Sequence, residues 1–267
     1  MCLILFAWRC HPGYRLILAA NRDEFFARPA AAMAAWPDWP GIVAGRDLQA
    51  GGTWFGLARD GRFAAVTNYR DPHAFSPDAL SRGRLPVDYL QSGVTPWQFC
   101  TRHRQEWPRY NGFNLLLGDA GDLVYASNRL DHPHRVAPGI HGLSNHLLDS
   151  PWPKVARGRE HLRRLLASSA EVDCNRLFAL LEDKWQPPAA ELPDTGVGPE
   201  WERLLATIFI SGSSYGTRSS LVLTVEDSGR TTCIERRFRH AQGAAVEDGR
   251  VGYSCNPPDG ELKILVP

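Results

Sequence analysis

The sequence predicts an α+β fold in which two antiparallel β-sheets stack face to face and helices cover their outer faces. Short apolar runs occur in pairs around turn residues, a pattern typical of β-hairpins. Several runs, such as residues 16–18 and 115–117, are apolar at every position, which favours strands buried on both faces. A pair of amphipathic helical segments between residues 150 and 181 interrupts the hairpins.

Turn and capping residues set the limits of the predicted elements. Asp60–Gly61, between two β-rich runs, is the clearest hairpin turn in the sequence. Thr95 followed by Pro96 marks a helix start. The Thr side chain can accept a hydrogen bond from a free amide of the first turn, and Pro lacks only an amide N–H that would have no partner at that position. The predicted strands lie in residues 3–8, 15–20, 41–47, 53–58, 63–68, 112–118, 123–127, 136–144, 208–210, 217–226 and 231–238, the predicted helices in 85–91, 95–107, 150–166 and 173–181, and the longer predicted loops in 30–40, 71–84 and 186–199.

Composition bounds the class of protein. The 267 residues are 43% hydrophobic, which is enough for one large core, and we expect a single domain over residues 1–267. The formal net charge is +1 and no basic run occurs, so the sequence gives no sign of nucleic-acid binding. No apolar stretch approaches the roughly 20 residues that span a bilayer, so we expect no stable membrane insertion.

The amino terminus and the cysteines indicate a cytoplasmic protein. The first residues lack a basic segment, and Arg9 interrupts their apolar run, so we do not expect a signal peptide. The six cysteines show no C-x-x-C spacing, which favours reduced thiols over a disulfide framework or a metal site.

The first two residues suggest a catalytic group. Loss of Met1 would leave Cys2 with a thiol of pKa about 8.5 beside an α-amine of pKa about 7.7–8.0. Part of the amine is unprotonated near neutral pH and can accept the thiol proton, so nucleophile and base share one residue. The end of the second strand of an antiparallel hairpin lies beside the start of the first, which predicts that residues 21–24 lie near Cys2. This arrangement indicates an N-terminal-nucleophile hydrolase.

Motifs along nearly the whole chain resemble one family. The run Asn21-Arg22-Asp23-Glu24 is similar to the signature of the NRDE family, also called the transport and Golgi organisation family. Further blocks resemble that family in its order: Gly51-Gly52-Thr53-Trp54, Thr67-Asn68-Tyr69-Arg70, Ser81-Arg82-Gly83, Tyr110-Asn111-Gly112-Phe113-Asn114, Gly142-Leu143-Ser144-Asn145, Pro151-Trp152-Pro153-Lys154 and Tyr215-Gly216-Thr217-Arg218-Ser219. The resemblance implies an Ntn-hydrolase-like, four-layer αββα sandwich. It also implies links to membrane and lipid homeostasis and to haem trafficking.

A second, more distant resemblance is to the choloylglycine hydrolase and acid amidase group. Those enzymes begin Met-Cys, and Cys2 matches their nucleophile, while Asn21 and Asp23 match residues at the end of their second strand. Their arginine would fall at Ala20, so this chain departs from the pattern there, and Arg22 is the nearest guanidinium. A later Ser-Asn pair and a late arginine match the sequence at Ser144-Asn145 and Arg218.

The second resemblance implies four catalytic residues. Cys2 would attack an amide or thioester carbonyl, and Asp23 would hold the α-amine by a hydrogen bond. Asn145 would donate its side-chain N–H to the oxyanion. Arg218 would stabilise Asp23 or bind a substrate carboxylate through two parallel hydrogen bonds.

Four further residues are candidates for substrate binding: Asn21, Arg22, Trp54 and Asn68. For Arg22 the alternative is a structural ion pair with Glu24, and for Trp54 it is ordinary core packing. None of the nine histidines lies in a haem-ligand motif, so we expect no required cofactor, with haem as a possible ligand.

Two functions from different classes remain open at this point. The first is a cysteine amidohydrolase or thioesterase that acts on a lipid-like acyl substrate. The second is a non-catalytic haem or acyl-lipid binding and trafficking protein that uses the same cleft. The expected partner is accordingly a small acyl molecule or haem, and the sequence does not specify an oligomeric state.

Overall fold

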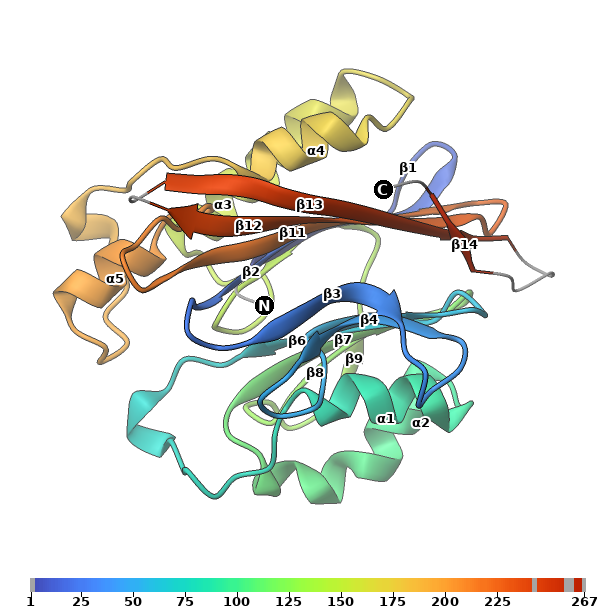
Figure 1. Cartoon of the computed structure of the whole chain (residues 1–267), viewed down its shortest axis with the longest axis horizontal. Helices are drawn as coiled ribbons and strands as arrows, with labels where there is room; N and C mark the ends of the chain where they lie inside the picture. Colours follow the sequence, from blue (N-terminus) through green and yellow to red (C-terminus); the bar gives the residue numbers. More distant parts are fainter. Residues whose placement is uncertain (1–2, 242–243, 257–261, 266–267) are drawn as a thin grey trace.

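The structure, a computed structural model, describes residues 3–241, 244–256 and 262–265. Within these residues the strands form two seven-stranded sheets in which every pair is antiparallel (Figure 1). The first sheet has the order β10 (Gly139–Leu143), β1 (Leu3–His11), β2 (Tyr14–Phe25), β11 (Tyr215–Glu226), β12 (Thr231–Ala241), β13 (Ala244–Cys255) and β14 (Lys263–Ile264). The second has the order β3 (Ala30–Ala35), β4 (Ile42–Asp47), β5 (Phe55–Ala58), β6 (Phe63–Asn68), β7 (Phe113–Gly118), β8 (Leu123–Ser127) and β9 (His134–Arg135).

Helices cover the outer face of each sheet. Helices α3 (Pro153–Ala167) and α4 (Cys174–Leu181) lie over the first sheet, and α1 (Arg84–Ser92) and α2 (Pro96–His103) lie over the second (Figure 1). Helix α5 (Pro199–Leu205) lies to one side, near the end of the sandwich. The predicted four-layer αββα arrangement is therefore confirmed.

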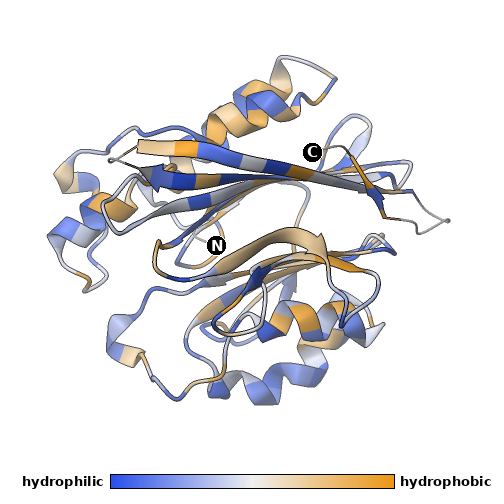
Figure 2. Ribbon diagram, viewed as in Figure 1, coloured by the Kyte–Doolittle hydropathy of each residue, from blue (hydrophilic) through white to orange (hydrophobic). Residues whose placement is uncertain are grey.

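The strand residues alternate between two cores, as the pleat requires. On β1, Ile4 and Phe6 point into the core between the sheets, while Leu3 and Leu5 point toward α3 and α4. A third cluster of buried side chains lies between the second sheet and α1 and α2. Hydrophobic and hydrophilic residues are interleaved on α1, as expected of a helix with one face on a sheet (Figure 2). No helix in the described ranges is long and apolar enough to cross a lipid bilayer.

Several elements differ from the prediction. The Ala-rich stretch 30–40, predicted as a loop, begins with the edge strand β3, where Met33 is held by Glu235 of the facing sheet through its backbone amide. Residues 208–210, predicted as β-structure, lie outside the named strands, and α5 and β13 were not predicted. The alanines and the charged residues of β13 have low strand propensity, so pairing with neighbouring strands decides their structure.

Close backbone contact joins two of the sequence blocks. A Cβ added to Gly52 would lie 2.4 Å from the carbonyl carbon of Gly83, so Gly52 has no room for a side chain, and a Cβ added to Gly83 would lie 3.0 Å from the carbonyl oxygen of Thr53. The amide of Thr53 also donates to the Gly83 carbonyl at 2.9 Å. This contact fixes the segment before α1 against the loop that carries Trp54.

Gly118 on β7 provides a test of the packing between β6 and β7. A Cβ at Gly118 would lie 2.1 Å from the ring of the buried, directly opposite Phe63, and the rigid ring cannot move away. We expect Gly118→Ala to destabilise the protein by about 1–3 kcal/mol in urea unfolding. Gly121→Ala, in the following turn, meets only an Asp119 oxygen at 3.6 Å and should stay within about 0.5 kcal/mol of wild type. Equal stabilities for the two variants would contradict the packing described here.

Candidate active site

Four neighbouring strands bring their candidate residues to the same end of the first sheet. Because the three pairs are antiparallel, β1 and β11 begin where β2 and β10 end. One row across the sheet runs through Leu143, Ile4, Ala20 and Leu221. Adjacent strands are about 4.8 Å apart, so the residues just beyond this row gather within a few strand widths.

The predicted catalytic residues come from these converging ends. Cys2 lies outside the described residues, and the described chain begins at Leu3, opposite Asn21. The other three predicted residues are described. Asp23 lies near the end of β2, Asn145 follows β10, and Arg218 lies in β11.

Asp23 is buried and held by a threonine. Its Oδ1 accepts a hydrogen bond of 2.7 Å from the Thr217 hydroxyl, and Asp23 and Thr217 lie opposite each other in the β2–β11 pair. The same hydroxyl accepts the amide N–H of Ile210 at 2.9 Å. Because that amide occupies the acceptor side of the hydroxyl, the threonine proton is directed to Asp23.

Asn21 is fully buried and joins three segments through its amide. Its Nδ2 donates to the carbonyl oxygens of Leu181 at 2.9 Å and Ile208 at 2.8 Å, and its Oδ1 accepts from the Ser220 hydroxyl at 2.6 Å. Both amide hydrogens are used by these bonds. Asn21 therefore fixes the end of α4 and residue 208 against the strands that carry Asp23 and Thr217.

Arg22 points the opposite way from Asn21 and Asp23, into the space between the sheets. Its guanidinium lies 4.2 Å from the ring centroid of Trp54, and both side chains are buried. Arg22 also forms an ion pair with Glu24 at 3.8 Å. Trp54, predicted to bind substrate or to fill the core, belongs to the core between the sheets and carries this cation on its ring face.

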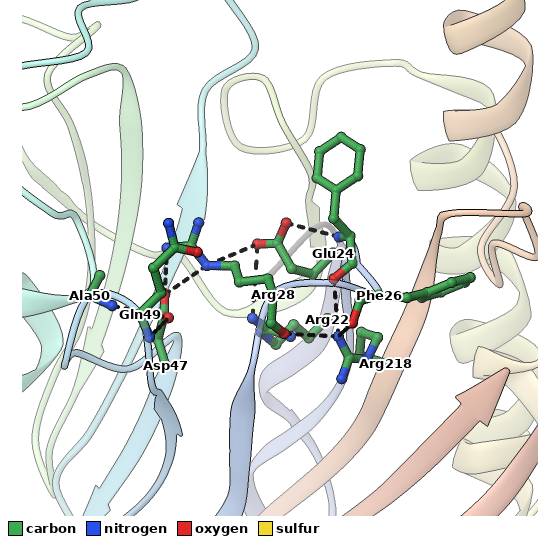
Figure 3. Close-up of polar contacts among 9 residues, drawn as sticks. Arg22, Glu24, Phe26, Arg28, Asp47, Gln49, Ala50 and Arg218 are labelled. Atoms are coloured by element: carbon green, nitrogen blue, oxygen red, sulfur yellow. Dashed lines mark hydrogen bonds and ion pairs between the residues drawn. The ribbon is translucent and has the colours of Figure 1, made fainter.

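Arg218 binds the segment of residues 25–28, which connects β2 of the first sheet to β3 of the second. Its Nη1 donates to the carbonyl oxygens of Phe25, Phe26 and Arg28 at 3.0, 3.2 and 3.1 Å (Figure 3). The hydrogen bond to Asp23 that was considered for Arg218 is made by Thr217 instead. In this structure Arg218 positions the loop that follows β2.

The same loop is tied to the second sheet by an ion pair. Arg28 donates to Oδ2 of Asp47 at 2.7 and 3.0 Å, and the other oxygen of Asp47 accepts the amides of Gln49 and Ala50 (Figure 3). These bonds hold the pKa of the Asp47 carboxyl below its usual range, although burial opposes the shift. Glu24 lies 3.8 Å from Arg28, so the two acids bracket this guanidinium.

Asn145 and Asn68 contact each other directly. Asn145 is 6% exposed, and its Nδ2 donates to the carbonyl oxygen of Asn68 at 3.0 Å. The backbone of Asn145 accepts the amide of Arg70 at 2.7 Å. An amide nitrogen carries two hydrogens, so one N–H of Asn145 has no partner among the described residues. The Asn68 side chain is exposed at this position.

A buried network supports the loop that carries Asn145, and the sequence reasoning did not identify it as part of the site. Asn114 donates to the Thr67 hydroxyl at 3.0 Å and to the His146 carbonyl at 2.9 Å. Tyr125 donates to Oδ1 of Asn114 at 2.8 Å and accepts the amide of Leu148 at 3.1 Å. The loop between β10 and α3 is thus fixed against β7 and β8.

A buried ion pair lies beside this loop and was also missed. Arg70 contacts Glu202 of α5 at 2.7 Å, and the guanidinium lies 4.8 Å from the Trp152 ring centroid. The second oxygen of Glu202 accepts the Thr195 amide at 2.7 Å. The only sequence signal was the position of Arg70 within one of the family blocks, because nothing near Glu202 marks it as buried.

Glu235 belongs to a third feature that the sequence reasoning missed. It lies on β12, is 1% exposed, and accepts the Met33 amide of the facing sheet at 2.8 Å. Burial raises the pKa of the Glu235 carboxyl, while the hydrogen bonds from Met33 and Ser219 and the cations Arg237 and Arg22 oppose the rise. The alternation of β12, with Cys233 also inward, could have identified Glu235 as buried.

The described cysteines are not activated. Burial raises the thiol pKa of all five: Cys10, Cys100, Cys174, Cys233 and Cys255. A raised pKa disfavours the thiolate, which is the nucleophilic form. Within the part of the chain that the structure describes, no three His, Cys, Asp or Glu side chains gather as metal ligands.

Comparisons with known proteins agree on a family. A family model described as "Transport and Golgi organisation 2" matches residues 1–240. The mouse "Transport and Golgi organization 2 homolog" is 35% identical over 256 residues, covering 88% of this chain and 92% of the relative. The Drosophila melanogaster "Transport and Golgi organization protein 2" is 27% identical over 263 residues, covering 88% and 91%.

Two solved structures are similar at 10% sequence identity. A mutant conjugated bile acid hydrolase from Clostridium perfringens has a TM-score of 0.49, and the match covers 100% of this chain and 97% of that one. A Caenorhabditis elegans ortholog of N-acylethanolamine-hydrolyzing acid amidase has a TM-score of 0.42, with 83% and 92% covered.

The raised pKa of Glu235 predicts a pH-dependent loss of stability. Above the ordinary value of 4.5, the unfolded chain ionises this carboxyl while the folded protein keeps it protonated, so the folded state binds more protons and stability falls as pH rises. Glu235→Gln removes this contribution. In urea unfolding, wild type should lose stability relative to Glu235→Gln as pH rises from 4.5 toward the folded pKa.

The exposed acid Glu171 provides the control. Glu171→Gln makes the same chemical change at an exposed position and is measured over the same pH range. A difference between wild type and Glu235→Gln that stays flat, or grows in favour of wild type with rising pH, would refute the assignment.

Proposed function

The chain belongs to the Transport and Golgi organisation 2 family, and from this premise we propose that it is an N-terminal-nucleophile cysteine hydrolase. The substrate would be an amide or thioester of a lipid-like acyl group, and Cys2 would be the nucleophile after removal of Met1. The family name points to a role in transport and Golgi organisation, to which such an activity could contribute.

The observation that carries the proposal is the convergence of Asp23 and Asn145 at the start of β1. Cys2 is bonded to Leu3, so its Cα is about 3.8 Å from that of Leu3 in any trans conformation. Leu3 pairs with Asn21, and Asp23 follows two residues later on the same strand face. Burial raises the thiol pKa of the five described cysteines, which disfavours their nucleophilic thiolate forms.

The proposed reaction begins with transfer of the thiol proton of Cys2 to its own α-amine. The thiolate attacks the carbonyl carbon, the C–S bond forms, and the carbonyl electron pair becomes an oxyanion. Collapse of this intermediate breaks the bond to the amine or thiol leaving group, which takes the proton from the α-ammonium. Water, deprotonated by the α-amine, then attacks the acyl-enzyme thioester and releases the acid and the thiol.

The surrounding residues would orient these steps. Asp23, with its Oδ1 held by Thr217, would accept a hydrogen bond from the α-amine. Asn145 would direct its remaining Nδ2–H to the oxyanion, because Asn68 fixes the orientation of the other N–H. Arg218 would act as a positioning residue through the loop of residues 25–28.

The first test is covalent labelling of Cys2. Intact mass should show removal of Met1, and an acyl probe with a thiol-reactive ester should add one acyl group at Cys2. Cys2→Ala should abolish the adduct, whereas Cys10→Ala, which removes an exposed thiol, should leave it unchanged. Retention of Met1, or labelling that follows Cys10 instead, would refute the hydrolase. Binding of an acyl lipid or haem without labelling would support the non-catalytic carrier instead.

The second test concerns the oxyanion donor. Asn145→Ala should slow acylation of Cys2 by about 10²–10³, the usual cost of one such donor. Asn175→Ala, an exposed asparagine on α4, is the matched control and should acylate at the wild-type rate. Urea unfolding of both variants separates a catalytic loss from misfolding. An Asn145→Ala variant that is folded and acylates normally would remove Asn145 from the mechanism.

A further inference from the structure

Three arginines from three adjacent strands line a small pocket between the sheets. Arg22 of β2, Arg218 of β11 and Arg237 of β12 share the lining with Trp54 and the start of β3, and the volume is about 70 Å³. A single water needs about 10–15 Å³, so the pocket has room for a small polar group. It is too small for an acyl chain.

The pocket is positively charged on balance. The three guanidinium groups remain charged at any ordinary pH. Two acids also line the pocket, but Asp248 lies at the surface with 36% of its side chain exposed. Glu235 is buried, and burial raises the pKa of its carboxyl. Three fixed cations therefore face at most two negative charges, one of them well solvated.

Two of the arginines have donors that the fold does not use. Arg218 donates to the three loop carbonyls through Nη1 alone. Within the described residues, its Nε and Nη2 make no hydrogen bond. Among the described residues, the ion pair of Arg237 is a long one with Asp248, at 4.0 Å, and the Arg237 side chain is 41% exposed. An ion pair of this length and exposure contributes little, so a ligand can replace it.

Arg22 forms a buried part of the pocket lining. Its guanidinium lies over the ring of Trp54, 4.2 Å from the ring centroid, and is buried, so it adds a fixed positive charge to the pocket. A guanidinium group can donate two parallel hydrogen bonds to the oxygens of a carboxylate or phosphate group. The guanidinium groups of Arg218 and Arg237, with the buried charge of Arg22 beside them, fit an anion better than a neutral group.

We propose that this pocket binds the carboxylate or phosphate group of an anionic ligand, with Arg218 and Arg237 as the principal donors. In the proposed hydrolase, on which this part rests, the ligand is an acyl substrate whose anionic group anchors it beside Arg22, next to the end of β2. The anion pocket thus restricts the substrate class to acyl molecules that carry a negative group.

Calorimetric titration of the full chain tests this inference with three ligands of equal chain length: octanoate, octyl phosphate and octanamide. We expect at least one anion to bind and octanamide not to bind. Binding of the anion should weaken as salt increases. A preference for octanoate would identify a carboxylate ligand, and a preference for octyl phosphate would identify a phosphate.

Arg237→Met is the informative variant, because the Arg237 side chain is 41% exposed and makes no hydrogen bond to the part of the chain that the structure describes. It should weaken anion binding by about tenfold, the usual effect of one charge-assisted hydrogen bond. Arg239→Met, on the same strand, is exposed, does not line the pocket and should bind within about twofold of wild type. Equal affinity in both variants, or equal binding of octanamide and the anions, would overturn the proposal.

The titration separates this inference from the proposed function because it measures no turnover. Cys2→Ala should bind the anion as wild type does. Anion binding without acylation of Cys2 would reject the hydrolase and leave the pocket in place. Acylation of Cys2 without any anion dependence would reject the pocket and leave the hydrolase in place.

Discussion

The pairing register of β1 and β2 is the constraint on which the site depends. Leu3, the first described residue, lies opposite Asn21, so the described chain begins beside the polar run 21–24. A slip of one residue would turn every side chain of β2 to the opposite face, exchanging Arg22 for Asp23. Both faces of β2 are buried, which makes such a slip costly. The same register fixes β11, because Thr217 must lie opposite Asp23 to bond it.

The alternation of this run divides the site into two chemical environments. Asn21 and Asp23 face the helical side, where neutral hydroxyl and amide groups hold them. Arg22 faces the other sheet, where an aromatic ring and nearby carboxyls offset the cost of burying its charge. A buried charge without such partners is strongly unfavourable, so the neighbouring residues are part of the reason that Arg22 is tolerated. One strand thus presents an amide and a carboxylate on one face and a guanidinium on the other.

The sequence predicted the layers and the convergence of the strand ends, but not the residues that fix the site. Hairpin signals such as Asp60–Gly61 depend on local turn chemistry, which a single sequence shows directly. Glu202 is buried only because distant segments cover it, and such contacts leave no local pattern, whereas the alternation of β12 carried a signal for Glu235 that the prediction did not use. Strand β3 was missed for a related reason, because its alanines become a strand only through the neighbouring β4 and the bond from Met33 to the facing sheet.

Ala20 and Arg22 show how the pleat places side chains at the end of β2. Two residues along a strand return to the same face, and Ala20 and Arg22 both point between the sheets. They lie one pleat repeat apart, about 6.6 Å along the strand. The Arg22 guanidinium is therefore nearer the strand end than Ala20, where it lines the pocket with Arg218 and Arg237. Because β2, β11 and β12 are adjacent in the sheet, strand pairing and not a local sequence pattern brings these three cations to one small space.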